Sequence, residues 1–515
     1  MLAPLQLMNI FVVVSFIHHT TSLRQISPLK TFFTKPLTDQ RNGLRTSILR
    51  VRGGLFGASN IVSTRFQEFN FSPDKLFDNI FITLLCNVFA LQFLNRISTR
   101  RIGIDKNSTL KKKNVKSLQL RFLVVFWLMR MADWLQGPYF YEVYSTKIIN
   151  GLPVSLDLVS KLFLIGFAST GLLGPWLGQL VDNRGRKAGT LAYAFFYALG
   201  ALSTLSNKLS HLFLGRVASG VGTSLLFSAP EAWLVKEHSK DDVDGKWLNQ
   251  TFGWAYAGDA IIAILAGQIA SGMAKRYGPT GPFLSSILYL ALGSFLAYIL
   301  WGEKQDVKLN DENVKKEGLR EAFQIINADR RIVLVGMIQA LFEGAMYIFV
   351  LQWAPILRNV IQSAFTNSVS IPYGKIFSCF MVSCLMGSTL FNVMISKLNF
   401  PIEFIIAMLT SVSMASFASI SFIGEKAGLG SVILAFLIFE VCVGMYFPSI
   451  GTLRSKYIPD RHRSTIMSIF GIPLNMIVIA VSLSIKYLGS YGALKCVAAA
   501  LGLAFASSTV LIGCR

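Results

Sequence analysis

The sequence predicts an all-α membrane protein with many spans, and three features of composition and pattern lead to this prediction. Hydrophobic residues make up 53% of the 515 residues and charged residues only 15%, whereas soluble domains carry about 25% charged residues. Apolar runs of about 20 residues, the length that crosses a bilayer as a helix, recur between residues 78 and 513. Basic residues gather in short loops between these runs, as is typical of the cytoplasmic side of a membrane.

The first 77 residues are expected to form a targeting leader or a disordered basic extension. Residues 5–17 are apolar and suit the core of a signal peptide, although no basic start precedes them. Residues 18–67 are basic, rich in Ser and Thr, and contain the single acid Asp39. This composition resembles a two-part leader of the kind used for plastids with extra membranes. A disordered tail behind a weak signal anchor fits equally well.

The rest of the chain predicts one extra helix followed by two six-helix halves. Residues 78–118 hold a helix at 78–95 and a basic loop, which places that loop in the cytoplasm. The halves are 119–301 and 331–515, and the charged residues 302–330 between them read as a cytoplasmic linker. The expected spans are 119–145, 158–181, 188–206, 209–235, 249–272 and 282–301, then 331–357, 373–397, 402–423, 429–453, 464–488 and 491–513. Such an internal repeat is typical of secondary transporters.

A short charged loop between the second and third of these spans carries the first motif, Gly178-Gln-Leu-Val-Asp182-Asn-Arg184-Gly185-Arg186-Lys187. Its pattern, G-x-x-x-D-x-x-G-R-K, resembles the cytoplasmic signature loop of the major facilitator superfamily of transporters. The resemblance implies the major facilitator fold, with 12 core helices in two halves, here preceded by one extra helix. We expect the acid and the arginines of the loop to form an inter-helix charge lock at a cytoplasmic gate. The alternative is that these charges only set the topology. The candidate gate residues are Gly178, Asp182, Arg184, Gly185, Arg186 and Lys187.

Three further segments are more specific: D-W-L-Q-G-P-Y from Asp133, F-S-A-P-E-A-W from Phe227 and Y-F-P-S from Tyr446. Together they resemble the molybdate-anion transporter family, a eukaryotic branch of the superfamily. That resemblance implies a carrier whose partners are the lipid bilayer and a small anion, molybdate, with a proton as a candidate co-substrate. It favours the plasma membrane, whereas the leader leaves a plastid or another internal membrane open.

Ionisable residues inside the predicted spans mark the candidate cavity. A charge at the centre of a membrane helix costs about 2.5–3.5 kcal/mol on insertion scales, so such residues normally face protein or water. The interiors of the third, sixth, ninth and twelfth core spans carry none, and in facilitator carriers these helices are the outer supports. The candidate substrate and coupling residues are Arg130, Asp133, Gln136, Arg216, Glu231, Asp259, Glu343, Glu440 and Tyr446.

Arg216 is the candidate for an oxyanion contact, because a guanidinium offers a planar fork of donors and keeps its charge. A structural ion pair is an equal alternative for Arg216. The carboxylates would repel a dianion, and two explanations stay open. Burial either keeps them protonated, which would couple transport to a proton gradient, or they pair with Arg130 and Arg216.

These observations predict a secondary active transporter that moves molybdate by alternating access. A facilitator for sulfate, a sugar or an organic anion is the nearest alternative, and a non-transporting receptor or scaffold on the same fold is another. We expect no enzyme, because no nucleophile–base set and no phosphate loop is found. The six cysteines form no C-x-x-C pair and no zinc-ligand cluster, so no metal and no cofactor are expected. The net charge of +22 is read as loop charge rather than as a nucleic-acid surface.

Overall fold

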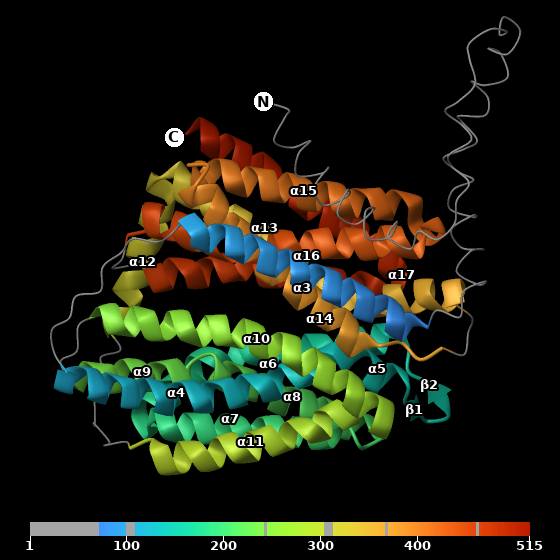
Figure 1. The fold of residues 1–515 in the computed structure, drawn as a ribbon, viewed down its shortest axis with the longest axis horizontal. Coiled ribbons are helices and arrows are strands. Elements are labelled where there is room, and N and C mark those ends of the chain that lie inside the picture. Colours follow the sequence, from blue (N-terminus) through green and yellow to red (C-terminus); the bar gives the residue numbers. More distant parts are fainter. Residues whose placement is uncertain are drawn as a thin grey trace, which may run out of the picture. The chain divides into compact units, whose positions relative to one another are not determined.

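The computed structural model describes residues 72–98, 109–240, 245–302, 313–365, 369–459 and 463–514. The predicted leader therefore lies almost wholly outside the described residues. Residues from Ser72 onward form one unit, which consists almost entirely of α-helices (Figure 1). The all-α prediction is confirmed.

The first half of this unit follows the predicted order of spans. The extra helix is α3 (Pro73–Ser98). The first half then contains α4 (Thr109–Gln136), the 3₁₀ turn η1 (Gly137–Tyr139), α5 (Phe140–Ser145), the strands β1 (Ile148–Ile149) and β2 (Leu152–Pro153), α6 (Leu156–Arg184), α7 (Arg186–Ser203), α8 (Leu209–Leu226), α9 (Ala229–Lys240), α10 (Gly245–Tyr277) and α11 (Gly281–Leu300). The two strands pair antiparallel as a small hairpin.

The second half begins after a helix in the linker. That helix is α12 (Asn313–Ala328), whose Ala322 and Ile326 are buried in a small apolar cluster with Ile466 and Phe470. The second half then contains α13 (Arg330–Phe365), α14 (Tyr373–Ser396), α15 (Ile402–Ile423), η2 (Gly424–Lys426), α16 (Leu429–Tyr457) and α17 (Arg463–Gly513).

Ten of the described helices are long and apolar enough to cross a membrane. Two of the predicted spans, now α4 and α7, fall outside this set because each carries basic residues within its length. Two others, 464–488 and 491–513, appear as the single helix α17, which bends at Gly489 with a φ of 63°. Since a positive φ suits glycine, the chain turns there without a loop.

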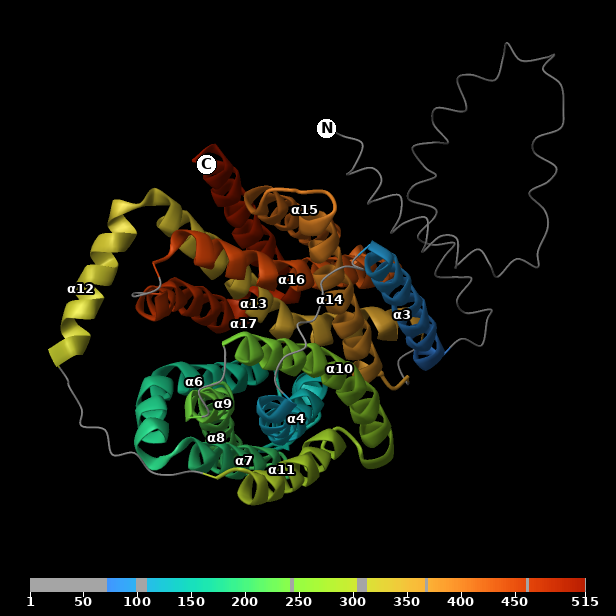
Figure 2. The same ribbon diagram turned by 60° about the vertical axis from the view of Figure 1, so that its left-hand side comes forward.

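The helices of each half pack around a central member. In the first half, α4 packs on α10 and α11, and it lies inside the ring that these make with α6 to α9 in Figure 2. In the second half, α13 packs on α16 and α17. The halves meet where α10 lies on α14 and where α6 lies on α17, and the extra helix α3 packs on α14.

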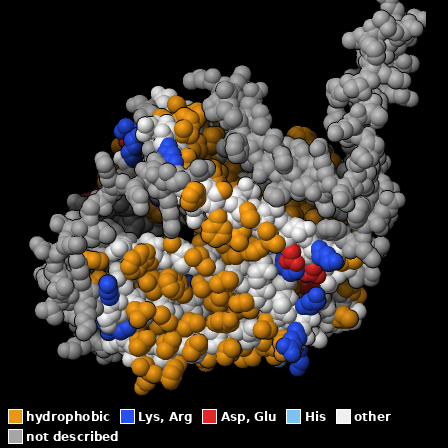
Figure 3. Space-filling view, viewed as in Figure 1, with side chains coloured by type: hydrophobic (Ala, Val, Ile, Leu, Met, Phe, Trp, Pro, Cys, Tyr) orange, Lys and Arg blue, Asp and Glu red, His pale blue; other side chains and the backbone are white. Residues whose placement is uncertain are grey.

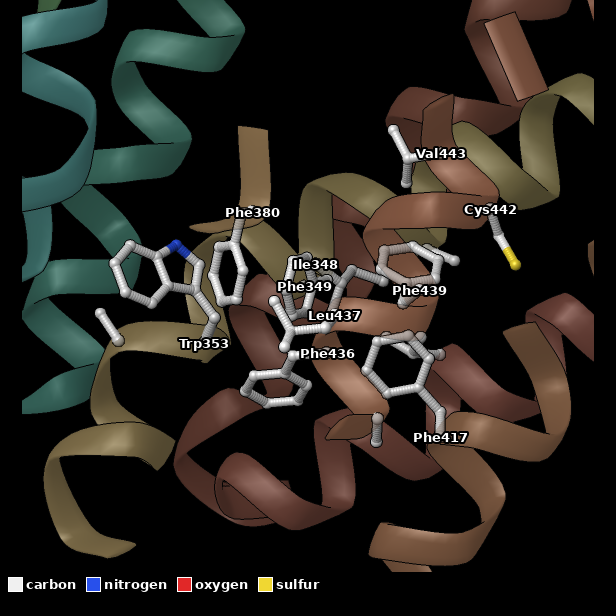
Figure 4. Packing of buried hydrophobic residues seen from close by; sticks show 14 of the residues in the cluster. Ile348, Phe349, Trp353, Phe380, Phe417, Phe436, Leu437, Phe439, Cys442 and Val443 are labelled. Atoms are coloured by element: carbon white, nitrogen blue, oxygen red, sulfur yellow. The ribbon is translucent and has the colours of Figure 1, made fainter. Parts of the chain in front are cut away.

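Aromatic rings fill the interior of the second half (Figure 4). Phe349 of α13 lies edge-on to Phe439 of α16, with ring centroids 5.1 Å apart, and Phe417 of α15 meets Phe439 at 4.7 Å. Edge-to-face pairs of this kind stabilise by about 0.5–1.5 kcal/mol beyond their buried area. In a bilayer such packing matters, because lipid is as apolar as the side chains and burial alone gives little driving force.

Small residues let some helices approach closely. A Cβ at Gly444 of α16 would overlap the carbonyl oxygen of Cys384 in α14, and a Cβ at Gly220 of α8 would crowd the carbonyl of Gly166 in α6. Glycine at helix contacts is typical of membrane proteins, since it lets backbones touch. The face shown in Figure 3 agrees with a membrane location, because hydrophobic side chains cover its middle and charged ones gather toward the ends of the helices.

Candidate functional site

An ion-pair network in the first half joins three of the predicted site residues. Arg130 of α4 donates from Nε and Nη2 to the two carboxylate oxygens of Asp259 in α10, both at 2.9 Å. Its Nη1 lies 3.3 Å from Asp133, one turn further along α4. The side chains are only 9%, 19% and 12% exposed for Arg130, Asp133 and Asp259. A forked pair of this kind is among the strongest hydrogen-bonded contacts in proteins.

Two aromatic donors complete this network. The indole nitrogen of Trp134 donates to Asp259 at 2.8 Å, and the hydroxyl of Tyr197 in α7 donates to Asp133 at 2.6 Å. The network holds two carboxylates and one guanidinium, so its formal charge is negative when both acids are ionised. It would therefore repel an anion rather than bind one.

Arg216 of α8 has a different environment. Its Nε donates to the backbone carbonyl of Leu162 in α6 at 3.2 Å, and its guanidinium lies 4.8 Å over the ring of Phe140. The phenol of Tyr144 also interacts with it, and Gly166 leaves room for it because a Cβ there would collide with the guanidinium. Among the described residues no carboxylate pairs with Arg216.

A second polar cluster lies in the other half. Glu343 of α13 accepts from the hydroxyl of Tyr446 at 3.0 Å and from Nη2 of Arg454 at 2.9 Å, both on α16. Nε of Arg454 donates to the side-chain oxygen of Gln339, one turn before Glu343, at 3.1 Å. The structure therefore brings the predicted Glu343 and Tyr446 into direct contact and adds Arg454, a residue that the sequence did not single out.

The remaining predicted cavity residues have separate partners. Gln136 donates to Ser286 of α11 at 2.9 Å, and Glu231 of α9 accepts from Tyr256 of α10 at 2.6 Å. Glu440 is 7% exposed on α16, and no hydrogen bond or ion pair involves it in the described part of the chain. Among the described residues, the contacts of the predicted set thus fall in several places rather than in one cluster.

The signature loop forms a sharp turn between α6 and α7. Gly185 ends α6 with a φ of 108°, which explains the glycine at that place in the motif. Lys187 donates to the backbone carbonyl of Tyr298 at the end of α11 at 2.7 Å, where a cation is favoured by the helix dipole. Gly178 lies within α6, Arg184 is exposed and Arg186 is half-buried. The side chain of Asp182 is outside the described side chains, so its pairing stays a prediction.

Arg454 is the main functional candidate that the sequence reasoning missed, because its position near the end of a span grouped it with loop charges. A usable signal existed. Side chains on a helix tilt toward its N-terminus, and for α16 that direction leads back into the predicted membrane. A long basic side chain one turn before the helix end can therefore reach inward. Trp134 and Tyr197 gave no such signal, because only the folded arrangement places Trp134 beside Asp259 and Tyr197 beside Asp133.

The two halves are joined at the end that the charge pattern places outside. Arg358, in the last third of α13, lies 3.6 Å from the carboxylate of Glu142 and donates to Ser145 at 3.3 Å. The rings of Tyr139 and Tyr373 meet nearby at 5.7 Å. We call these four contacting segments, η1 and α5 with the end of α13 and the start of α14, the outer contact.

Comparisons with known proteins fit this arrangement. A major facilitator family model described as sugar transporters with 12 transmembrane helices matches residues 76–437. A molybdate-anion transporter of Xenopus tropicalis is 31% identical over 372 residues, which cover 70% of this chain and 77% of that protein. The chain belongs to the molybdate-anion transporter family. A second member, from Danio rerio, is 30% identical over 414 residues, covering 74% of this chain and 82% of the relative.

Solved structures show the fold of this molybdate-anion transporter family member. A POT family transporter, solved in complex with a thioalcohol-conjugated peptide, superimposes with a TM-score of 0.59 at 14% identity, covering 78% of this chain and 95% of the other. A D-xylose–proton symporter gives 0.57 at 13% identity, covering 76% and 97%. The major facilitator fold predicted from the sequence is confirmed, and this family member is a multi-pass membrane transporter.

Proposed function

We propose that the protein carries molybdate across a membrane by alternating access. The relatives named above are molybdate-anion transporters, and the two halves meet along two helix pairs, α10 with α14 and α6 with α17. Rocking of one half against the other is the usual motion of such folds. The proposal places the protein in the plasma membrane, with an internal membrane as the other outcome of a localisation experiment.

The observation that carries the choice of an oxyanion is the environment of Arg216. Three other arginines of the span helices, Arg130, Arg358 and Arg454, each have a carboxylate partner. Arg216 has a carbonyl, an aromatic ring and a phenol instead. A cation without a counter-ion is costly away from water, and a tetrahedral dianion would offset that cost. Guanidinium geometry suits such an anion because two parallel N–H groups can bind two of its oxygens.

The carboxylates and the signature loop have roles in the same proposal. Asp133 and Asp259 neutralise Arg130 and hold α4 to α10, whereas Glu343 and Glu440 are candidates to carry a co-transported proton. The loop from Gly178 to Lys187 would fasten the cytoplasmic ends of the first half in one state of the cycle, while the outer contact fastens the other end. In this proposal Glu231 and Gln136 have a structural role, because their hydrogen bonds join α9 to α10 and α4 to α11.

The test is uptake of radioactive molybdate by cells that lack their own carrier. We expect uptake above the empty vector, competition by tungstate and little competition by sulfate. The Arg216→Ala variant should transport about 10- to 150-fold less per molecule, from the 1.5–3 kcal/mol of a hydrogen bond to a charged group. Arg276→Ala is the matched control, because Arg276 is exposed at the end of α10.

Three results would contradict the proposal. Uptake at the vector level, with the protein shown to be in the membrane, would remove molybdate as the substrate. Competition by a sugar rather than by tungstate would favour the sugar carriers named in the family description. If the purified protein in liposomes moved none of these solutes, a non-transporting receptor or scaffold would be favoured.

A further inference from the structure

We propose that Arg454 and Glu343 form a second oxyanion site, toward the cytoplasmic end of the carrier, which opens when Glu343 takes up a proton. This inference rests on the proposed molybdate transport and adds to it the residues that would couple anion and proton. It concerns residues other than Arg216, so the two can be tested apart.

Arg454 keeps unused capacity to bind an anion. A guanidinium has five N–H donors, and the contacts described for Arg454 use Nε for Gln339 and one Nη2 hydrogen for Glu343. The other N–H groups have no protein acceptor in the described part of the chain. The side chain is 19% exposed, so the guanidinium can be reached without unfolding of the surrounding helices.

The position of Arg454 separates this site from Arg216. Arg454 lies three residues before the end of α16, which is about 5 Å from its cytoplasmic end at 1.5 Å per residue. Arg216 lies seven residues after the outer start of α8, about 10 Å from that end. An anion that moves between the two sides would meet the two arginines in turn. Because the outer contact joins the halves at the other end, the Arg454 site suits exchange with the cytoplasm.

Glu343 controls whether Arg454 is available. While the carboxylate is ionised, it neutralises the guanidinium at 2.9 Å and would repel a dianion. A proton on Glu343 removes that negative charge, and the cation then lacks a counter-ion in a poorly hydrated place, which favours an entering anion. The hydroxyl of Tyr446 is fully buried and bonds the same carboxylate oxygen as Arg454. It holds the carboxyl group in place in either protonation state.

The charges around Glu343 leave Arg454 as its partner. Tyr347, one turn away on α13, and Tyr446 are the other titratable groups that face it. Residues 464–485 of α17 and 162–181 of α6, the two helices that approach α13 from its other sides, contain no ionisable side chain.

The ends of α13 carry charges that already have partners. At the outer end, where α5 meets α13, Glu142 lies with Arg358. At the inner end, next to α12, Asp329 lies with Arg331. Each of these pairs lies near an end of α13, whereas Glu343 contacts Arg454 and Tyr446, so the titration of Glu343 should depend mainly on Arg454 and on the anion.

The test is calorimetric titration of the purified full-length protein with molybdate, in buffers of different ionisation enthalpy at one pH. The dependence of the measured heat on the buffer gives the number of protons taken up with each anion. We expect about one proton for the wild type and about none for Glu343→Gln, which should still bind because its Arg454 is permanently unmasked. Arg454→Gln should bind about 10- to 150-fold more weakly, and Arg454→Lys should recover part of the loss.

The outcomes separate the two proposals. A wild type that binds without taking up protons, or a Glu343→Gln variant with an unchanged proton count, would overturn the coupling. An Arg454→Gln variant with unchanged affinity and transport would overturn the site while leaving molybdate transport intact. A wild type that neither binds nor transports molybdate would overturn both proposals. Arg331→Gln is the matched control, because it removes an exposed arginine that is already paired with Asp329.

Discussion

Removing the guanidinium of Arg130 should destabilise the first half more than removing either of its acids. Without Arg130, Asp133 and Asp259 would share a buried place with no cation, although Trp134 and Tyr197 would still donate to them. Leaving a buried charge without its partner costs about 3–5 kcal/mol. For the Arg130→Leu variant we therefore expect a loss of this size in the free energy of unfolding of the half.

The same geometry predicts unequal effects for the two acids. Asp259 receives two hydrogen bonds from Arg130 at 2.9 Å, whereas Asp133 receives one at 3.3 Å. Asp133→Asn keeps the forked pair and removes the excess negative charge, so its cost should be below about 1 kcal/mol, as for a weakly placed ion pair. Asp259→Asn breaks the fork and should cost about 2–4 kcal/mol, somewhat less than the loss of the cation.

Thermal unfolding of the detergent-solubilised protein, followed by the fraction that remains monodisperse after heating, would rank the variants. The expected order of stability is wild type, Asp133→Asn, Asp259→Asn and Arg130→Leu, with the first two close together. The double variant Arg130→Leu with Asp259→Leu should be more stable than Arg130→Leu alone, because one of the stranded charges is gone. The reasoning would be refuted if Arg130→Leu unfolded at the same temperature as the wild type, or if Asp133→Asn and Asp259→Asn lowered the unfolding temperature equally.

Three further predictions follow from other contacts. Arg358→Glu should weaken the outer contact and raise the reactivity of cysteines placed on its inner side toward a thiol reagent. Adding Glu142→Arg should restore the contact and lower that reactivity again. Unchanged cysteine reactivity in Arg358→Glu would count against a closed outer end. Gly444→Ala should destabilise the fold by about 1–3 kcal/mol through overpacking and so lower the yield of folded protein. Gly451→Ala should leave the yield unchanged, because Gly451 has open space around it. Equal yields of the two variants would contradict the close approach of Gly444 to Cys384. Hydrogen bonds from the neighbouring Arg331 lower the pKa of Asp329 at the start of α13. The small stabilising effect of the ionised Asp329 should therefore be present at neutral pH and lost as the pH falls through that lowered pKa. An Asp329→Asn variant with the same acid unfolding profile as the wild type would refute this prediction.

The positions of the spans could be predicted because a bilayer imposes a length and an apolar composition on every helix that crosses it. The apolar run predicted at residues 78–95 lies within α3, and the segment that joins the two halves is rich in charged residues. The break between α8 and α9 was harder to place. Phe227 and Ser228 leave the helix just before Pro230, and the sequence indicated only that this proline permits bending.

The partners of the charged residues could be predicted only in part. The proximity of Arg130 and Asp133 followed from their spacing of three residues on one helix. The stronger partner, Asp259, lies 129 residues further along the chain, and no local pattern identifies it. Arg454 shows the same limit, because hydropathy gives the depth of a backbone position and not the direction in which a long side chain extends.

The extra helix α3 has a consequence for the synthesis of the protein. Lys375 of α14 binds Asp74 at 3.1 Å and Asp78 at 2.8 Å, and Lys375 lies 297 positions after Asp78 in the chain. A ribosome adds about 5–20 residues per second, so α3 enters the membrane about 15–60 s before its basic partner is made. During that interval Asp74 and Asp78, near the N-terminal end of a lone helix, lack Lys375. The nascent chain therefore holds an unfinished helix pair while the whole first half is inserted, and completion of α14 closes it.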